Sequence, residues 1–143
     1  CYSMIGLADT QIICERNSYI EMLKFEQLNR DFVVCKTKSL NHIDLTKEFV
    51  FLSKTDDEIS VVCEEKDLPE DVTETETGWK GLKICGPLDF SLVGIIAKIT
   101  SLLAQEQISV FVVSTYNTDY IFLKNKFYEN ALEVLDVNGY IID

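Results

Sequence analysis

The spacing of apolar residues is clearest in residues 81–142, which read GLKICGPLDFSLVGIIAKITSLLAQEQISVFVVSTYNTDYIFLKNKFYENALEVLDVNGYII. It predicts a strand at 81–86, a helix at 91–105, a strand at 108–115, a return strand at 119–123, a helix at 126–137 and a last strand at 140–142. Joined by right-handed crossovers, this β-α-β-β-α-β order predicts the ferredoxin-like α+β plan: a four-stranded antiparallel sheet with both helices on one face.

The chain before residue 81 predicts strands and little helix. Residues 23–28 alternate apolar and polar, 31–37 form an apolar run, and 49–54 and 58–65 form a hairpin around a polar turn. We therefore expect a reduced copy of the ferredoxin-like plan in this part of the chain.

These patterns divide the chain into four parts. Residues 1–21 lack the pattern of a signal peptide and are expected to form a loosely ordered extension. Residues 22–66 are expected to form the reduced N-terminal module, 67–78 an acidic linker, and 79–143 the complete C-terminal module.

Composition narrows the class of protein. With 143 residues, 47% apolar and 26% charged, the chain is globular and of a size for one domain or two very small ones. The net charge of -11 argues against nucleic acid and anionic membranes as partners. No apolar run reaches the roughly 18 residues that a membrane-spanning helix needs.

The acidic residues concentrate between Asp56 and Glu76, where Lys66 is the single basic residue. This run is either a site for cations or a basic partner, or a solvated connector; we favour the connector. Pro69 and Gly78 punctuate it as a linker would.

The cysteines and the single histidine predict no metal site. Five cysteines are widely spread without a CxxC pattern, and three of them, Cys35, Cys63 and Cys85, lie in strand-like runs. We expect buried free thiols, and therefore a reducing, cytoplasmic setting. His42 lies in a polar stretch and is expected at the surface.

No motif predicts catalysis or a cofactor. The sequence contains no GxSxG, HExxH or GxGxxG pattern and no phosphate-binding glycine loop, so we expect a non-enzyme without cofactor. An RNA-binding domain of this plan needs aromatic strands in basic surroundings, and the charge here is opposite.

Four stretches together resemble a known family: Gly78–Lys83, Gly86–Gly94, Leu103–Phe111 and Ser114–Ile121. They are similar to the small proteins with two tandem ACT modules, relatives of the regulatory domains of aspartate kinases. The cytosolic arginine sensors of the TOR pathway look like distant members. The resemblance covers residues 23–143 and implies two tandem ACT-like units with antiparallel sheets.

Members of this family bind amino acids and change shape or association state. The resemblance therefore implies an allosteric, non-catalytic sensor that binds a small amino acid at a seam between modules, next to the first strand-to-helix loop. A homodimer or a regulated protein partner is expected with it. The alternative is a protein-interaction or dimerisation adapter without a small-molecule ligand.

The candidate site combines this loop with the end of the following hairpin. Loop amides at a helix start favour a ligand carboxylate, although Gly86-Pro87 also suits a plain tight turn. Asp119 either holds a ligand ammonium or guanidinium group or caps the turn at 116–119. The candidate ligand-binding residues are Gly86, Pro87, Leu88, Asp89, Phe90, Ser91, Ser114, Thr115 and Asp119.

Several of these positions have simpler structural interpretations. The hydroxyls of Ser114 and Thr115 can bond the turn backbone, and Asp89 or Ser91 can cap the helix. Trp79 is expected to pack between the modules. Gly94, expected inside the helix, suggests a close approach of backbone or ligand.

Overall fold

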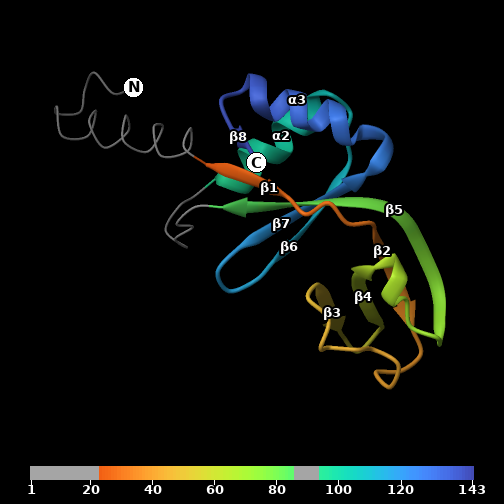
Figure 1. Cartoon of the computed structure of the whole chain (residues 1–143). Coiled ribbons are helices and arrows are strands. Elements are labelled where there is room, and N and C mark those ends of the chain that lie inside the picture. The colour runs from red at the N-terminus through yellow and green to blue at the C-terminus, as the bar shows by residue number, and fades with distance from the viewer. Residues whose placement is uncertain (1–22, 86–93) are drawn as a thin grey trace.

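The computed structural model describes residues 23–85 and 94–143 (Figure 1), in which one sheet of eight strands carries two α-helices. None of the helices in these two ranges is both long and apolar enough to cross a bilayer. The elements in chain order are β1 (Lys24–Gln27), β2 (Phe32–Thr37), β3 (Val50–Lys54), β4 (Ile59–Glu64), η1 (Glu65–Asp67), β5 (Val72–Cys85), α2 (Ile95–Gln105), β6 (Val110–Ser114), β7 (Asp119–Lys124), η2 (Asn125–Phe127), α3 (Tyr128–Val137) and β8 (Ile141–Ile142).

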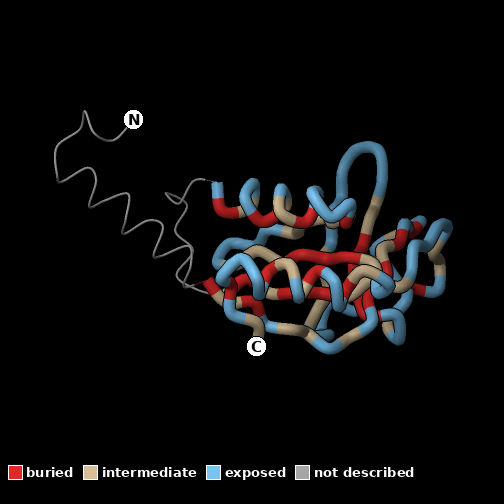
Figure 2. Tube along the Cα trace, turned by 90° about the horizontal axis from the view of Figure 1, so that it is seen from above, coloured by how far each residue is buried: buried red, intermediate tan, exposed pale blue. Residues whose placement is uncertain are grey.

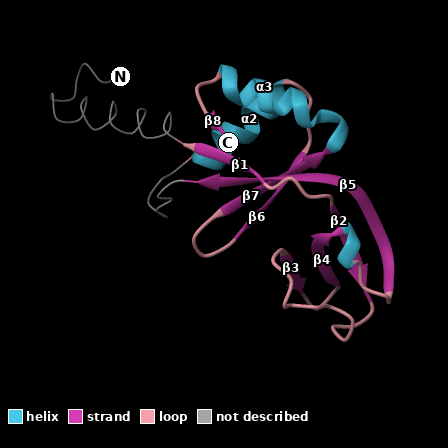
Figure 3. Ribbon diagram, in the orientation of Figure 1, coloured by secondary structure: helices cyan, strands magenta, loops and turns pink. Residues whose placement is uncertain are grey.

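From β5 onward the chain follows the predicted β-α-β-β-α-β order. Figure 3 shows α2 and α3 together over this part of the sheet. Apolar side chains from both helices and from the strands beneath form one buried core, in which Ile99, Leu103 and Leu135 are fully buried. The helix faces that carry these residues therefore pack on the sheet, as the apolar spacing in the sequence predicts.

The sheet is mixed, which corrects the expectation of purely antiparallel sheets. Strand β1 pairs antiparallel with β5 and parallel with β8, so it lies between the first and last strands of the C-terminal module. The alternating pattern of residues 23–28 predicts a strand but not its neighbour. Leu23 and Phe25 are buried in the same core as the helices.

Strand β5 belongs to both halves of the sheet. Its residues Val72–Trp79 pair with β2, and its residues Leu82–Cys85 pair with β1. On its other edge, Trp79–Lys83 pair with β7. Residues 72–78 are thus strand, not the irregular connector expected within 67–78. They lack apolar periodicity because most of their side chains are exposed, and backbone pairing with β2 holds them.

An aromatic cluster fills the seam between the N-terminal strands and the face of the C-terminal sheet without helices. Phe122 is fully buried and lies 4.9 Å from Phe111, 5.1 Å from Phe32 and 5.7 Å from Phe51, centroid to centroid. These distances are those of favourable ring pairs. Figure 2 shows buried residues running along the strands at the centre of the molecule.

The N-terminal half repeats only part of the C-terminal module. Elements β6, β7 and η2 begin at residues 110, 119 and 125, each 60 residues after β3, β4 and η1 at 50, 59 and 65. Residues 23–66 contain no α-helix, and the tandem arrangement of two ACT-like units, the first of them reduced, stays a prediction. Residues 38–49 take the place of a first helix as irregular chain.

Two helix starts differ from the sequence analysis. Helix α2 begins at Ile95, and Gly94 precedes it at φ 84° rather than lying inside the helix. This left-handed conformation explains the glycine, because other residues adopt it at a cost. The helix predicted at 126–137 begins at Tyr128, because Asn125 to Phe127 form the 3-10 turn η2. The predicted caps Asp89 and Ser91, and residues 1–21, lie outside the described residues.

Truncation of Phe122 tests whether the aromatic cluster holds the halves together. We expect Phe122→Ala to lower the free energy of unfolding by about 3–5 kcal/mol, because it removes a fully buried ring with three ring neighbours. Urea denaturation measures the change. The exposed control Val137→Ala should cost less than about 0.5 kcal/mol. Equal effects of the two variants would contradict the packing.

Candidate functional site

The described part of the candidate site lies at the end of the β6–β7 hairpin. Ser114 ends β6 and Asp119 begins β7, and the two residues are direct cross-strand partners. The loop residues Gly86 to Ser91 lie outside the described residues, so their part in the site stays a prediction.

Asp119 shares the helix-facing side of β7 with Ile121, because side chains alternate along a strand and Ile121 is buried in the helix-covered core. Asp119 is partly buried. Among the residues that the structure describes, no hydrogen bond or ion pair involves its carboxylate. A partly buried carboxylate without a partner is available to a cationic group.

Thr115, in contrast, is used by the turn. Its hydroxyl donates to the carbonyl oxygen of Thr118 at 2.8 Å and accepts from the Thr118 amide at 3.2 Å. Asp119 therefore does not close the turn, which Thr115 does. The turn contact that the sequence analysis considered for Asp119 is made by Thr115 instead. Within the described residues, Asp119 makes no hydrogen bond in this turn.

The same end of the sheet holds the end of β5 and the start of α2. Lys83 of β5 pairs with Tyr120 of β7, so Asp119 lies next to the last residues of β5, which ends at Cys85. In Figure 1 the arrowhead of β5 and the tip of the β6–β7 hairpin point to the same side. The chain re-enters the described part at Gly94 and begins α2 at Ile95, with no side-chain cap from any residue that the structure describes. The amides of a helix start carry partial positive charge and favour an anion.

Trp79 packs against the aromatic cluster that joins Phe32 and Val62 of the N-terminal half to Phe122, as expected from the sequence. Its ring lies 4.6 Å from that of Phe111, and the ammonium group of Lys124 lies 4.6 Å above it. His42 is exposed, with its Nδ1 3.7 Å from a carboxylate oxygen of Glu70. Neither residue lies in the candidate ligand site.

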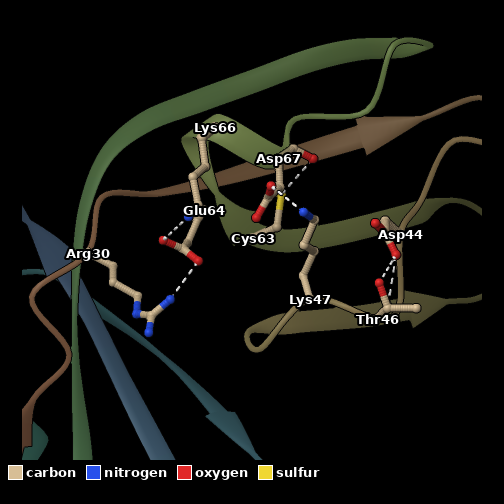
Figure 4. A network of polar contacts seen from close by, with 8 residues as sticks. All are labelled: Arg30, Asp44, Thr46, Lys47, Cys63, Glu64, Lys66 and Asp67. Carbon is tan, nitrogen blue, oxygen red and sulfur yellow. Dashed lines mark hydrogen bonds and ion pairs between the residues drawn. The ribbon is translucent and has the colours of Figure 1, made fainter.

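A polar network in the N-terminal half pairs acids of the acidic run with Arg30 and Lys47 from outside the run and with Lys66 from within it (Figure 4). The buried carboxylate of Glu64 accepts from the Arg30 guanidinium at 2.9 Å, and Arg30 also bonds Glu48. Lys47 lies 3.8 Å from Asp67. The network stabilises a buried charge and needs no ligand to do so. Arg30 and Lys47 come from outside the run, so counting charges along the run did not predict their pairs with Glu64 and Asp67.

The three cysteines in the described part are free thiols, as predicted, and Cys35 and Cys63 are buried. Burial raises the pKa of Cys63 to about 12 and raises the pKa values of Cys35 and Cys85 above their usual range. Residues 23–85 and 94–143 contain no group of three or more His, Cys, Asp or Glu side chains that could hold a metal ion.

Comparison with known families and structures adds a second line of information. Residues 74–136 match the family of the ACT domain. No curated protein matches the chain.

Solved structures resemble the chain over most of its length. A structural-genomics target from Agrobacterium tumefaciens is 28% identical, with a TM-score of 0.75, covering 85% of this chain and 92% of its own. A protein of unknown function from Vibrio cholerae, described as a possible transport protein, is 20% identical with a TM-score of 0.68, covering 85% and 93%. The regulatory subunit of aspartate kinase from Thermus thermophilus is 11% identical with a TM-score of 0.52, covering 80% and 94%. The latter two share the fold.

Alkylation rates test the burial of the thiols. At about pH 8 we expect iodoacetamide to modify Cys35 and Cys63 at least about tenfold more slowly than the partly exposed Cys85, because the reactive thiolate is disfavoured and enclosed. Mass spectrometry of digests gives the rate at each site. The same reaction in guanidinium chloride, where the rates should converge, is the control. Fast native modification of Cys63 would contradict the structure.

Proposed function

This chain carries an ACT domain in residues 74–136, and on that premise we propose that it is a non-catalytic, cytoplasmic sensor that binds a free amino acid. The ACT domain and its aspartate kinase neighbours point to a regulatory role. The proposed ligand lies at the sheet end between Asp119, Ser114 and the start of α2. Gly86 to Ser91 are proposed to contribute backbone amides.

The carboxylate of Asp119 carries this proposal. A carboxylate in a partly buried position costs free energy unless it has a partner, and the described residues offer it none. An ammonium group of a ligand supplies a charge-assisted hydrogen bond there. Ser114, directly opposite on β6, adds a hydroxyl that can donate or accept.

The start of α2 suits the other end of an amino acid. Within residues 23–85 and 94–143 no side chain caps its first amides, and the positive end of the helix dipole favours a carboxylate. An α-amino acid presents both charges on one carbon atom. At one end of the sheet, Asp119 therefore suits the ammonium group of an amino acid, and the first amides of α2 suit its carboxylate.

A second candidate function is an adapter that acts through protein contacts alone, as a homodimer or on a regulated partner. Exposed leucines in the N-terminal half favour it: Leu45 is 64% exposed and Leu40 46%. The two functions are compatible, because a sensor needs a partner to report to. The binding of any free amino acid distinguishes the sensor function from the adapter function.

A thermal-shift screen of the twenty amino acids tests ligand binding. At about ten times its Kd, a bound amino acid adds about 1.4 kcal/mol of stability and raises Tm by about 3 °C. Asp119→Asn should abolish this shift for the ligand that produces it, because the variant removes the charge that meets the ammonium group while keeping the size of the side chain.

Asp136→Asn is the matched control, because Asp136 is an exposed acid on α3, a helix that contributes no residue to the proposed site. It should leave the ligand-induced shift unchanged. If no amino acid stabilises the chain, or if Asp119→Asn and Asp136→Asn respond alike, the proposed site is wrong and the adapter function takes its place.

A further inference from the structure

The first half of β5 has one side without a neighbouring strand. Residues 72–79 pair with β2 on one side, and on the other side β7 pairs only with residues 79–83. Trp79 pairs with both strands, which places β2 and β7 on opposite sides of β5. Among the strands of residues 23–85 and 94–143, none pairs with the β7 side of residues 72–77. We call this side of residues 72–77 the β5 edge.

The β5 edge is open to solvent in the part of the chain that the structure describes. Residues 73–77 are all exposed. In Figure 1 this half of β5 runs along the outer border of the N-terminal strands, with β2 on its inner side. An open edge presents backbone N–H and C=O groups without partners, and an extended segment of another chain can pair with them. The backbone therefore determines the shape of the occupant, which is a strand.

Threonine and glutamate alternate along the edge, because residues 73–77 read Thr-Glu-Thr-Glu-Thr. Successive side chains of a strand point to opposite faces, so Glu74 and Glu76 share one face and the threonines share the other. Glu74 forms no hydrogen bond or ion pair with any described residue, although Lys36 of β2 is its cross-strand partner. Negative charge thus recurs at every second position on one face of the edge.

The glutamate face of the edge continues into an open groove. Glu74 and Glu76 line this groove together with Glu58, the residue before β4. All three glutamates are exposed, and Lys36 is the one basic residue described along the groove. The groove is therefore negatively charged, and it favours basic side chains on a strand that lies along its rim.

The chain already places one lysine against this edge. Lys124 is the last residue of β7 and the cross-strand partner of Trp79, directly beside the open part of β5. Its ammonium group lies 3.2 Å from a carboxylate oxygen of Glu76 and donates to the carbonyl oxygen of Thr77 at 2.7 Å. A basic side chain on the neighbouring strand thus bonds both a glutamate and a backbone group of β5. After Lys124 the chain leaves the sheet as η2.

A second copy of the chain does not suit the β5 edge. Opposite residues of an antiparallel ladder share a face, so pairing of the edge with itself would set glutamate opposite glutamate. Like charges directly opposite each other destabilise a pair of strands. Each chain also carries a net charge of -11, which adds repulsion between copies. A basic segment of a different protein meets neither obstacle.

We propose that the β5 edge docks an extended segment of a partner protein that carries lysine or arginine at every second position. The segment adds a strand to the sheet beside β5, and its basic side chains pair with Glu74 and Glu76. Backbone hydrogen bonds supply affinity, and the alternating charges determine the register. The edge lies at the opposite end of β5 from the Asp119 site, and the proposal stands without an amino-acid ligand.

A peptide of alternating threonine and lysine, Thr-Lys-Thr-Lys-Thr-Lys-Thr, is the probe, because its lysines match the spacing of the two glutamates. Titration into the ¹⁵N-labelled full chain should shift the amide signals of residues 72–77. The control peptide, Lys-Thr-Thr-Lys-Thr-Thr-Lys, has the same composition and charge but sets neighbouring lysines on opposite faces of a strand. It should bind about threefold more weakly or less, since one of the two charge pairs is lost.

Charge reversal on the protein locates the contact. Glu74→Lys with Glu76→Lys should weaken binding of the lysine peptide by about tenfold or more and create binding of Thr-Glu-Thr-Glu-Thr-Glu-Thr. Glu129→Lys with Glu133→Lys makes the same change of net charge at two exposed positions of α3. This control should keep the preference for the lysine peptide. The exposure of all four residues preserves the fold, which the spectra check.

Three results would overturn the proposal. The first is the absence of shifts at residues 72–77 at millimolar peptide. The second is equal binding of the two lysine peptides, because net charge alone then accounts for the binding. The third is a preference that the β5 edge variant does not reverse, or that the α3 variant reverses as well.

Discussion

The backbone pairing of β5 is the constraint on which the rest of the structure depends. This strand of 14 residues pairs with β2 through its first half, with β1 through its second half, and with β7 across Trp79–Lys83. Strands of both halves are therefore bonded to one continuous backbone. A rotation of one half relative to the other would break backbone hydrogen bonds between β5 and its neighbouring strands. Breaking these bonds leaves buried backbone amides without partners, which costs free energy.

This arrangement also links the candidate ligand site to the N-terminal half. Side chains alternate along β7, so Asp119 faces the helix side while Tyr120 faces the aromatic cluster. The ring of Tyr120 lies 5.1 Å from Phe51 and 6.3 Å from Phe49, both next to or within β3. A shift of Asp119 on binding a ligand would therefore be passed to Tyr120, the next residue of β7, which contacts the N-terminal half.

Much of the C-terminal module could be predicted, because its helices and strands bury periodic apolar faces. Ile95, Ile99 and Leu103 indicate their helix by spacing alone, and all three are buried. The first half of β5 could not be predicted this way, since exposed residues such as Glu74 and Glu76 carry no burial pattern and only pairing with β2 makes them strand. The place of β1 beside β8 likewise depends on long-range pairing, which alternation does not specify.

The reduced copy expected from the strand pattern has a fixed interval of 60 residues, which the apolar pattern alone does not indicate. Phe51, Thr55 and Lys66 match Phe111, Thr115 and Lys126 around equivalent hairpins and turns. In both turns the threonine hydroxyl, that of Thr55 or Thr115, accepts a hydrogen bond from a backbone amide. For the candidate site, the sequence placed Ser114 and Asp119 close together correctly, because strand partners around a short turn are fixed by its length. The expectation that the Thr115 hydroxyl can bond the turn backbone is confirmed by its contacts with Thr118.

Native-state hydrogen exchange tests the central claim, that one shared strand makes the two halves a single structural unit. The account predicts that the most protected amides of β2 and β4 exchange with the same free energy of opening as those of β5 and β7, because all four strands open together. The account would be contradicted if the β2–β4 amides exchanged through a separate opening of much lower free energy while the C-terminal module stayed protected.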